Sequence, residues 1–214
     1  MTFLLGLTGS IGMGKSATAI MFRDLGIPVH DADWAVHDLY RGRAAPLIEE
    51  AFPGTVVDGV VDRSRLSERV VGRPHALRRL ESVVHPLVRE EEGAFLRRAA
   101  SERRALVVLD VPLLFETGGE RRCDAALVVT ASPAVQEERV LARPGMTAEK
   151  FAAIRAKQMP DDEKRRRAHF IVDTAHGFTR ARAAVSDIVR ALAGRPGRIL
   201  ASRHEEEASS GPAA

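Results

Sequence analysis

A glycine-rich stretch directly after the first apolar run is the feature that most constrains this chain. Residues 8–16 read TGSIGMGKS, in which a glycine, four further residues and Gly-Lys-Ser complete a phosphate-binding P-loop after Phe3–Leu7. Glycines let consecutive backbone N–H groups turn toward an anion, Lys15 brings positive charge to the β- and γ-phosphates, and the Ser16 hydroxyl suits Mg²⁺. The positive end of a helix running from Lys15 to about Leu25 would face the same phosphates. The stretch predicts a nucleotide site.

The same letters support a second interpretation. Residues 12–17 also fit the G-x-G-x-x-A dinucleotide fingerprint, and Asp31 lies near the distance expected of a ribose-binding acid. The first glycine after the strand is Gly9, however, and a dinucleotide-binding turn has no need of an adjacent Lys-Ser pair. A redox or dinucleotide-binding module stays open as an alternative at this point.

Composition bounds the class of protein. With 214 residues and 45% hydrophobic content, the chain suits one domain with an insertion or two. Its 32 basic and 29 acidic residues are interleaved, so a phosphate-rich small ligand explains the charge of +3 without a nucleic-acid partner. The single Cys123 favours a reducing compartment, the cytoplasm. No N-terminal signal and no run long enough to cross a bilayer is present, so no membrane partner is expected.

Short apolar runs alternate with helical patterns along most of the chain. This alternation predicts an α/β fold: a five-stranded parallel sheet flanked by helices in a P-loop core, covering 1–33 and 106–195. The predicted strands are Phe3–Leu7, Pro28–His30, Leu106–Val111, Ala125–Val129 and His169–Val172.

Two helical additions and a tail complete the expected organisation. Residues 34–105 form an all-helical insertion, in which Asp62 begins one helix and Pro86 another. A basic arm over about 136–167 breaks near 143–145 and 159–160, which suits a lid. The composition after Gly194 predicts a disordered tail over 196–214.

Acidic residues follow two of the predicted strands. Asp31 and Asp33 alternate to the same side if the strand continues, which would aim both at the phosphates, and Asp33 could serve as a general base. Alternatively, Asp33 caps a helix starting at Trp34. Asp110 ends the third strand, where a carboxylate either ligates Mg²⁺ or supports its shell. Glu116 lies close behind and either lines the acceptor pocket or is a plain surface acid.

Arginines of the arm could neutralise charge during phosphoryl transfer. Arg139 and Arg143 are four residues apart, which would place them on one helical face, and arginine matches phosphate oxygens with a planar fork. The run 164–167 (KRRR) is interpreted as a solvated helix face rather than a nucleic-acid patch. His85, at a predicted helix junction, is either structural or a ligand contact.

Several motifs in one order resemble the dephospho-coenzyme A kinase family over nearly all of residues 3–190. Besides the P-loop, these motifs are Leu25-Gly26, Asp31-Ala32-Asp33, Leu80-Glu81 leading to His85-Pro86, Pro112-Leu113-Leu114-Phe115-Glu116, and Gln158-Met159-Pro160 leading to Lys164. The resemblance implies ATP as donor, the ribose 3′-hydroxyl of dephospho-coenzyme A as acceptor, and Mg²⁺ as cofactor.

The resemblance also implies roles for single residues. It implies ATP on Gly12, Met13, Gly14, Lys15, Ser16, Ala17 and Arg143. It implies catalysis by Asp33, Lys15 and Arg139, and acceptor contacts from Asp33, His85, Pro86, Leu114 and Glu116. The chemistry of the loop and of the third strand's end places the expected Mg²⁺ on Ser16 and Asp110. The chain departs from the family pattern at Ala17, His169 and Thr174, the last where an asparagine often helps to hold adenine.

Two further alternatives and the assembly state complete the expectations. A kinase for another small acceptor, such as a nucleoside monophosphate, has the same P-loop. A GTP-dependent switch would need an Asn-Lys-x-Asp guanine contact, and the chain contains no asparagine. A monomer or weak homo-oligomer is expected.

Overall fold

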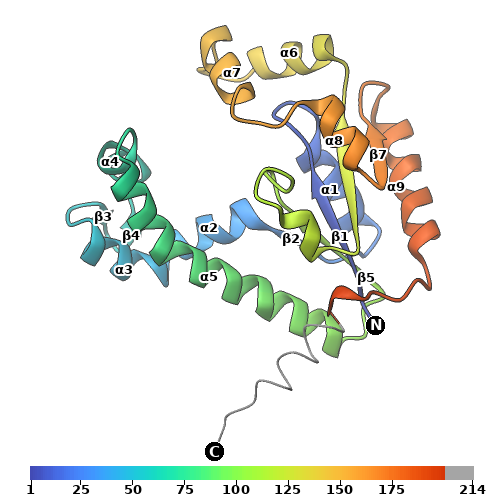
Figure 1. Ribbon diagram of the computed structural model, residues 1–214, viewed down its shortest axis with the longest axis horizontal. Coiled ribbons are helices and arrows are strands. Elements are labelled where there is room, and N and C mark those ends of the chain that lie inside the picture. The colour runs from blue at the N-terminus through green and yellow to red at the C-terminus, as the bar shows by residue number, and fades with distance from the viewer. Residues whose placement is uncertain (201–214) are drawn as a thin grey trace, which may run out of the picture. The chain divides into compact units, whose positions relative to one another are not determined.

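The chain folds into two compact units in the computed structural model, which describes residues 1–200 (Figure 1). The first unit contains residues 1–30 and the chain from Ala99 onward, and the second contains Asp31–Arg98. The insertion therefore begins at Asp31 rather than at 34 and ends at Arg98 rather than at 105. Within the described part of the chain, no helix is both long enough and apolar enough to span a membrane.

The first unit is built on the predicted five-stranded parallel sheet, which is confirmed. Its strand order is β2-β5-β1-β6-β7, so the strand that precedes the P-loop lies at the centre. The strands are β1 (Phe3–Thr8), β2 (Val29–Asp31), β5 (Leu106–Asp110), β6 (Ala125–Thr130) and β7 (Phe170–Asp173). Parallel pairing brings the carboxyl ends of β1, β5, β6 and β7 to one edge.

Both faces of this sheet are covered, which explains why its central strands are apolar throughout. Helices α1 (Lys15–Asp24) and α9 (Phe178–Leu192) pack together over one face (Figure 1), where Phe22 and Val185 join a core with Leu5, Leu7 and Leu127. Alternate strand residues point to the other face. There Thr130 contacts helix α8 (Asp161–Arg167).

The arm consists of three helices, and both predicted breaks are present. Helix α6 (Pro133–Leu141) begins with Ser132 as its N-cap and proline at its first position, and α7 (Ala148–Arg155) begins with Thr147 as its N-cap. The segments between α6, α7 and α8 contain Pro144-Gly145 and Met159-Pro160. A short 3₁₀ helix, η1 (Gly119–Arg122), follows β5.

The chain beyond α9 differs from the predicted disorder as far as residue 200. Asp124 accepts hydrogen bonds from the backbone N–H groups of Arg198 (2.7 Å) and Ile199 (3.1 Å), and Leu200 is buried. The prediction of disorder from residue 196 is therefore wrong for 196–200, because a buried side chain and a carboxylate hold that segment. Residues 201–214 of the predicted tail lie outside the described residues.

The second unit contains helices α2 (Ala32–Tyr40), α3 (Ala44–Ala51), α4 (Arg63–Val70) and most of α5 (Pro74–Ser101). It is not all-helical, because β3 (Val56–Val57) and β4 (Val60–Val61) form a hairpin. Asp58 and Gly59 make its turn, both with positive φ. An Asp-Gly pair between valines is a standard hairpin signal, and it was available in the sequence.

Helix α5 passes through Pro86 without a break, so the predicted new helix at that position is wrong. Pro86 removes one backbone donor, which costs a helix roughly 3 kcal/mol. Val84 and Leu87, on either side of it, are buried in the core of the second unit, and this packing holds the helix together. Asp62 caps α4 as predicted, accepting from the backbone of Ser64 and Arg65.

Candidate active site

The P-loop lies between the centre of the sheet and helix α1. Gly12 (φ 79°) and Gly14 (φ 90°) occupy the left-handed region, which side chains with a Cβ rarely adopt, and Gly14 is the N-cap of α1. Gly9 is required by space, because a Cβ there would lie 2.8 Å from the carbonyl oxygen of Val129. The loop thus turns its peptides at the positive end of a helix, the arrangement that binds phosphate.

Lys15, the first residue of α1, and Asp110, the last residue of β5, form an ion pair beside the P-loop. The Lys15 Nζ lies 2.7 Å from Asp110 Oδ1, and the carboxylate is 1% exposed. Ser16, in the first turn of α1, is exposed. The structure therefore brings together three of the predicted site residues, Lys15, Ser16 and Asp110, around one loop.

Two glutamines of the arm hold the backbone of Ile11 within the P-loop. Gln136 donates to the Ile11 carbonyl (2.7 Å), and the Ile11 N–H donates to Gln158 Oε1 (3.2 Å). Sequence reasoning missed Gln136, although a glutamine among the charged side chains of α6 could have been noticed. Because the backbone N–H and C=O of Ile11 are both hydrogen-bonded to arm side chains, the arm fixes the position of the loop.

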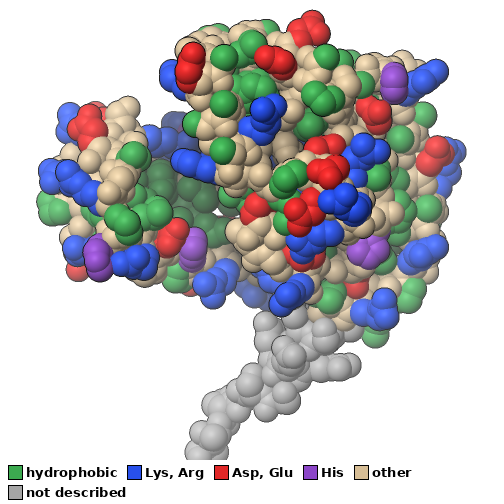
Figure 2. All heavy atoms as spheres, turned by 45° about the horizontal axis from the view of Figure 1, so that its top comes forward, with side chains coloured by type: hydrophobic (Ala, Val, Ile, Leu, Met, Phe, Trp, Pro, Cys, Tyr) green, Lys and Arg blue, Asp and Glu red, His purple; other side chains and the backbone are tan. Residues whose placement is uncertain are grey.

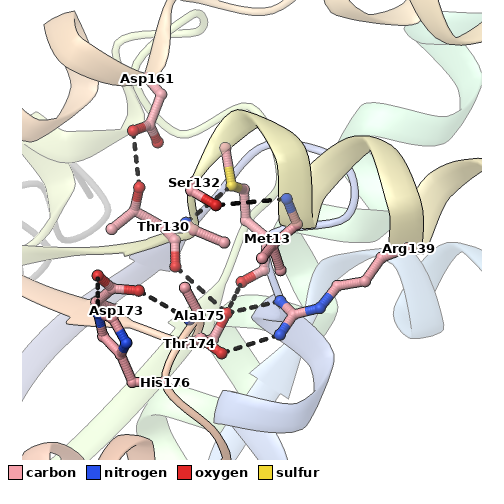
Figure 3. A network of polar contacts seen from close by, with 11 residues as sticks. Met13, Thr130, Ser132, Arg139, Asp161, Asp173, Thr174, Ala175 and His176 are labelled. Carbon is pink, nitrogen blue, oxygen red and sulfur yellow. Dashed lines mark hydrogen bonds and ion pairs between the residues drawn. The ribbon is translucent and has the colours of Figure 1, made fainter.

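Arg139 contacts the P-loop through the residue that follows β7. Its Nη1 donates to Thr174 Oγ1 (2.8 Å) and its Nη2 to the Thr174 carbonyl (2.9 Å), while Thr174 Oγ1 lies 2.8 Å from the Met13 carbonyl oxygen (Figure 3). Arg143 does not share this helical face. Helix α6 ends at Leu141, so Arg143 lies in the following turn and is exposed, and the predicted pairing of the two arginines is wrong.

A cavity of about 1260 Å³ opens beside the P-loop in the first unit. Residues from the loop, from the ends of β6 and β7 and from the three arm helices line it, among them Ser10, Met13, Thr130, Gln136, Asp161 and His176. Several of these side chains and their hydrogen bonds are visible in Figure 3. The cavity lies where a nucleotide held by the P-loop has room for its base and sugar.

Glu116 and Lys164 form a buried ion pair that secures the start of α8. Glu116 Oε1 lies 2.9 Å from Lys164 Nζ and accepts the Met159 N–H at 2.8 Å, and the Lys164 side chain is 0% exposed. Burial acts to raise the pKa of Glu116, but Lys164 and the Met159 N–H outweigh it, so the pKa lies below its ordinary value. The run 164–167 is therefore not a uniformly solvated face.

Arg167 also departs from that interpretation, since its guanidinium pairs with Glu120 and lies 4.9 Å from the centre of the Phe115 ring.

Leu114 is fully buried, in contact with the centre of the sheet. A Cβ on Gly6 would lie 2.8 Å from its Cδ2. The expected acceptor contact of Leu114 is therefore wrong, because the side chain fills the core. On the face shown in Figure 2, acidic and basic side chains are interleaved rather than gathered in one basic stripe.

The predicted acceptor residues of the second unit lie on α2 and α5. Asp31, not Asp33, caps α2, accepting from the Trp34 N–H at 3.0 Å. Asp33 is exposed in the first turn, so strand alternation does not set its direction. His85 and Pro86 are exposed on α5.

Asp33 also lines a cavity of about 470 Å³ within the second unit. Tyr40 and Arg63 line it as well, together with Leu66, Val70 and Leu80. The Arg63 guanidinium lies 5.5 Å from the centre of the Tyr40 ring. A carboxylate, a phenol and a guanidinium thus face one apolar-walled space.

Comparison with known proteins decides among the open alternatives. A model of the dephospho-CoA kinase family matches residues 3–179. The chain belongs to the dephospho-CoA kinase family. A dephospho-CoA kinase of Mesorhizobium japonicum is 61% identical over 194 residues, 91% of this chain and 98% of that protein. One from Brucella melitensis is 55% identical, over 90% of this chain and 96% of that protein.

Solved structures share the fold of this chain. A Thermus thermophilus protein, TT1252, is 37% identical with a TM-score of 0.79, over 92% of this chain and 99% of that one. A shikimate kinase from Acinetobacter baumannii, 17% identical with a TM-score of 0.52 over 92% of this chain and 97% of that one, shares the fold alone. The chain is a kinase of the dephospho-CoA kinase family, which uses ATP to phosphorylate dephospho-CoA in the final step of coenzyme A biosynthesis. Membership in this family removes the dinucleotide-binding and GTP-switch interpretations.

Proposed function

We propose that the enzyme moves the γ-phosphoryl group of ATP to the ribose 3′-hydroxyl of dephospho-CoA, and that Asp33 accepts the proton of that hydroxyl. The donor half of the proposal is supported by the P-loop. Residues 12–17 would hold the triphosphate through their backbone N–H groups, and the Lys15 ammonium would neutralise the β- and γ-phosphates. Ala17 lacks the side-chain hydroxyl of a serine or threonine, but its N–H is in the first turn of α1 and is retained.

Mg²⁺ fits the residues around the loop. Ser16 offers an exposed hydroxyl and Asp110 a carboxylate at the same end of the sheet, whereas the described residues contain no cluster of three or more His, Cys, Asp or Glu that could hold a metal alone. A metal held partly by nucleotide oxygens suits such a sparse donor set. When bound, the ion supplies charge neutralisation to the β- and γ-phosphates.

The acceptor half of the proposal is supported by the cavity that Asp33 lines. A carboxylate needs to reach the proton that it abstracts, and the exposed Asp33 lines an open cavity that an acceptor could enter from solvent. Burial raises the pKa of Tyr40 despite the nearby charge of Arg63, so the phenol stays protonated and can donate a hydrogen bond. Arg63 provides a planar fork for an acceptor phosphate.

His85, Pro86 and Glu116 are retained as proposed acceptor contacts. His85 and Pro86 are exposed on α5 and therefore available. Glu116 Oε1 is engaged by Lys164 and Met159, and Oε2 is buried without a hydrogen-bond partner among the described residues, so an acceptor hydroxyl that reached this pocket would satisfy Oε2. Arg139 and Arg143 are proposed to bind the transferring phosphate and the nucleotide. Cys123 is buried and belongs to no disulfide, which suits a reducing cytoplasm.

An acceptor panel tests the proposal. ADP release with ATP and Mg²⁺ would be measured for dephospho-CoA, adenosine, AMP and shikimate, and the product from dephospho-CoA would be located by ³¹P and ¹H NMR. The expected result is a kcat/KM for dephospho-CoA far above that for the others and a phosphate on the 3′-oxygen. Equal rates for AMP, or phosphate on the 2′-oxygen, would overturn the assignment.

A further inference from the structure

We infer that Thr174 is a positioning residue, whose hydroxyl joins Arg139 of the arm to the P-loop peptide between Met13 and Gly14. The inference rests on the proposed function of Arg139 at the transferring phosphate and assigns a role to a residue outside the P-loop and the arm. Thr174 directly follows β7, and its own N–H donates to the Thr130 carbonyl at 2.9 Å, which fixes its backbone. Thr174 is buried, with 8% of its surface exposed, so water competes little for hydrogen bonds to its hydroxyl.

The hydrogen-bond roles around this hydroxyl are settled by chemistry. An arginine has donors only, so Thr174 Oγ1 must accept from Arg139 Nη1, at 2.8 Å. The single hydroxyl proton is then available to a carbonyl. The Met13 carbonyl oxygen, at 2.8 Å, is closer than that of Thr130, at 3.3 Å. A charged donor at one end polarises such a chain and strengthens both bonds.

A second bond makes the orientation of Arg139 specific. Nη2 donates to the Thr174 carbonyl at 2.9 Å, so two nitrogens of one planar group contact the same residue (Figure 3). A further contact from Nη1 reaches the Gly12 carbonyl at 3.5 Å. The flexible Arg139 side chain is thereby held in one conformation before phosphate binds. Binding then costs less conformational entropy, because this side chain is already ordered.

The Met13 contact acts on the phosphate-binding loop through peptide geometry. The Met13 C=O and the Gly14 N–H belong to one planar trans peptide and point in opposite directions. Turning the carbonyl toward Thr174 therefore turns the Gly14 N–H away from it. Close packing adds to this restraint, because a Cβ on Gly14 would lie 3.0 Å from Thr174 Oγ1. One hydroxyl thus orients a loop N–H and an arm cation together.

Thr174→Val tests the inference, because valine keeps the shape and removes the hydroxyl. We expect kcat to fall about 10-fold, as for the loss of one hydrogen bond to a charged group, while Thr174→Ser keeps kcat within about 3-fold of wild type. Thr55→Val is the matched control. Thr55 is also buried and donates its hydroxyl proton to a backbone carbonyl, that of Phe52, but it belongs to the second unit.

A double-variant cycle with Arg139→Gln separates positioning from general stability. If Thr174 acts through Arg139, adding Thr174→Val to Arg139→Gln costs less than 3-fold in kcat. The inference would be overturned if the double variant lost kcat by the product of the two single-variant losses. A Thr174→Val variant with wild-type kcat, or a Thr174→Ser variant as slow as Thr174→Val, would overturn it as well.

ADP binding gives a readout that needs no acceptor. The dissociation constant should rise several-fold in Thr174→Val but not in Thr174→Ser, because Gly14 N–H orientation is affected in the former alone. Unchanged ADP affinity in the valine variant would overturn the loop half of the inference. If the wild type had no kinase activity with dephospho-CoA but Thr174→Val still weakened ADP binding, the proposed function would be refuted and the inference would stand.

Discussion

Lys15 Nζ, at the start of α1, lies 2.7 Å from Oδ1 of Asp110, the last residue of β5. The P-loop cation is thus paired with a carboxylate that is 1% exposed, and the pair joins the start of α1 to the end of β5. Removing one partner of a buried pair leaves a charge without compensation, which is more costly than removing both. This relationship gives the first prediction.

Lys15→Met should abolish turnover and also destabilise the fold by about 3 kcal/mol, because the buried Asp110 carboxylate loses the ammonium group that pairs with it. Adding Asp110→Asn should restore most of the melting temperature without restoring activity. Thermal unfolding and ADP release measure the two effects, with the exposed Lys157→Met as control. A double variant no more stable than Lys15→Met would contradict the role of the pair.

Asp33→Asn should lower kcat by about 10²- to 10⁴-fold with little change in the KM for ATP, as for loss of a general base. Asp38 lies on the same helix and is also exposed, so Asp38→Asn is the matched control and should keep wild-type turnover. Near-normal turnover in a folded Asp33→Asn variant would remove Asp33 from the chemistry.

Arg63→Gln should raise the KM for dephospho-CoA roughly 10-fold and leave the KM for ATP unchanged, because one charge-assisted contact to an acceptor phosphate is lost. With adenosine, which lacks that phosphate, the variant and the wild type should be equally slow. Arg65→Gln is the control, since Arg65 pairs with Asp62 and does not line the cavity. An effect of similar size with both acceptors would place Arg63 in the structure rather than in recognition.

Glu116→Gln should destabilise the enzyme at pH 7 by about 3 kcal/mol, because Lys164 loses its charged partner while fully buried. The folded pKa of Glu116 lies below the ordinary 4.5, so its ionised form stabilises the fold above that pH. This contribution is lost as the pH falls through the lowered folded pKa. The gap in melting temperature between wild type and variant should therefore narrow below pH 4.5.

Glu102→Gln removes one side of an exposed pair with Arg104 and serves as control for the Glu116 variant. Surface pairs contribute little, so its melting temperature should follow that of wild type at every pH. A gap for Glu116→Gln that stayed constant with pH would show that packing, rather than the ion pair, explains the loss.

The sheet and the P-loop could be predicted because their signals are local. Apolar runs and a fixed glycine spacing each depend on a few neighbouring residues. The breaks of the arm at Pro144-Gly145 and Met159-Pro160 could be predicted for the same reason, and both are present.

The failures lie where contacts distant in sequence decide. Pro86 reads as a helix start, yet burial of Val84 and Leu87 keeps α5 whole. Leu114 reads as a pocket residue, yet the absence of a side chain on Gly6 creates the space that it fills. Lys164 reads as one member of a solvated run, yet its ammonium group is buried in an ion pair with Glu116, which lies far earlier in the sequence. None of these partners is identifiable from spacing.

The carboxylate of Asp124 has a practical consequence for anyone trimming the protein. Its Oδ2 accepts the Leu4 N–H at the first strand, while its Oδ1 accepts two N–H groups near residue 200. A stop codon placed after α9 would remove the N–H groups of Arg198 and Ile199 that bind Asp124. It would also expose the start of β1, the strand that leads into the P-loop. Versions shortened for crystallisation or fused to a reporter should end no earlier than Leu200.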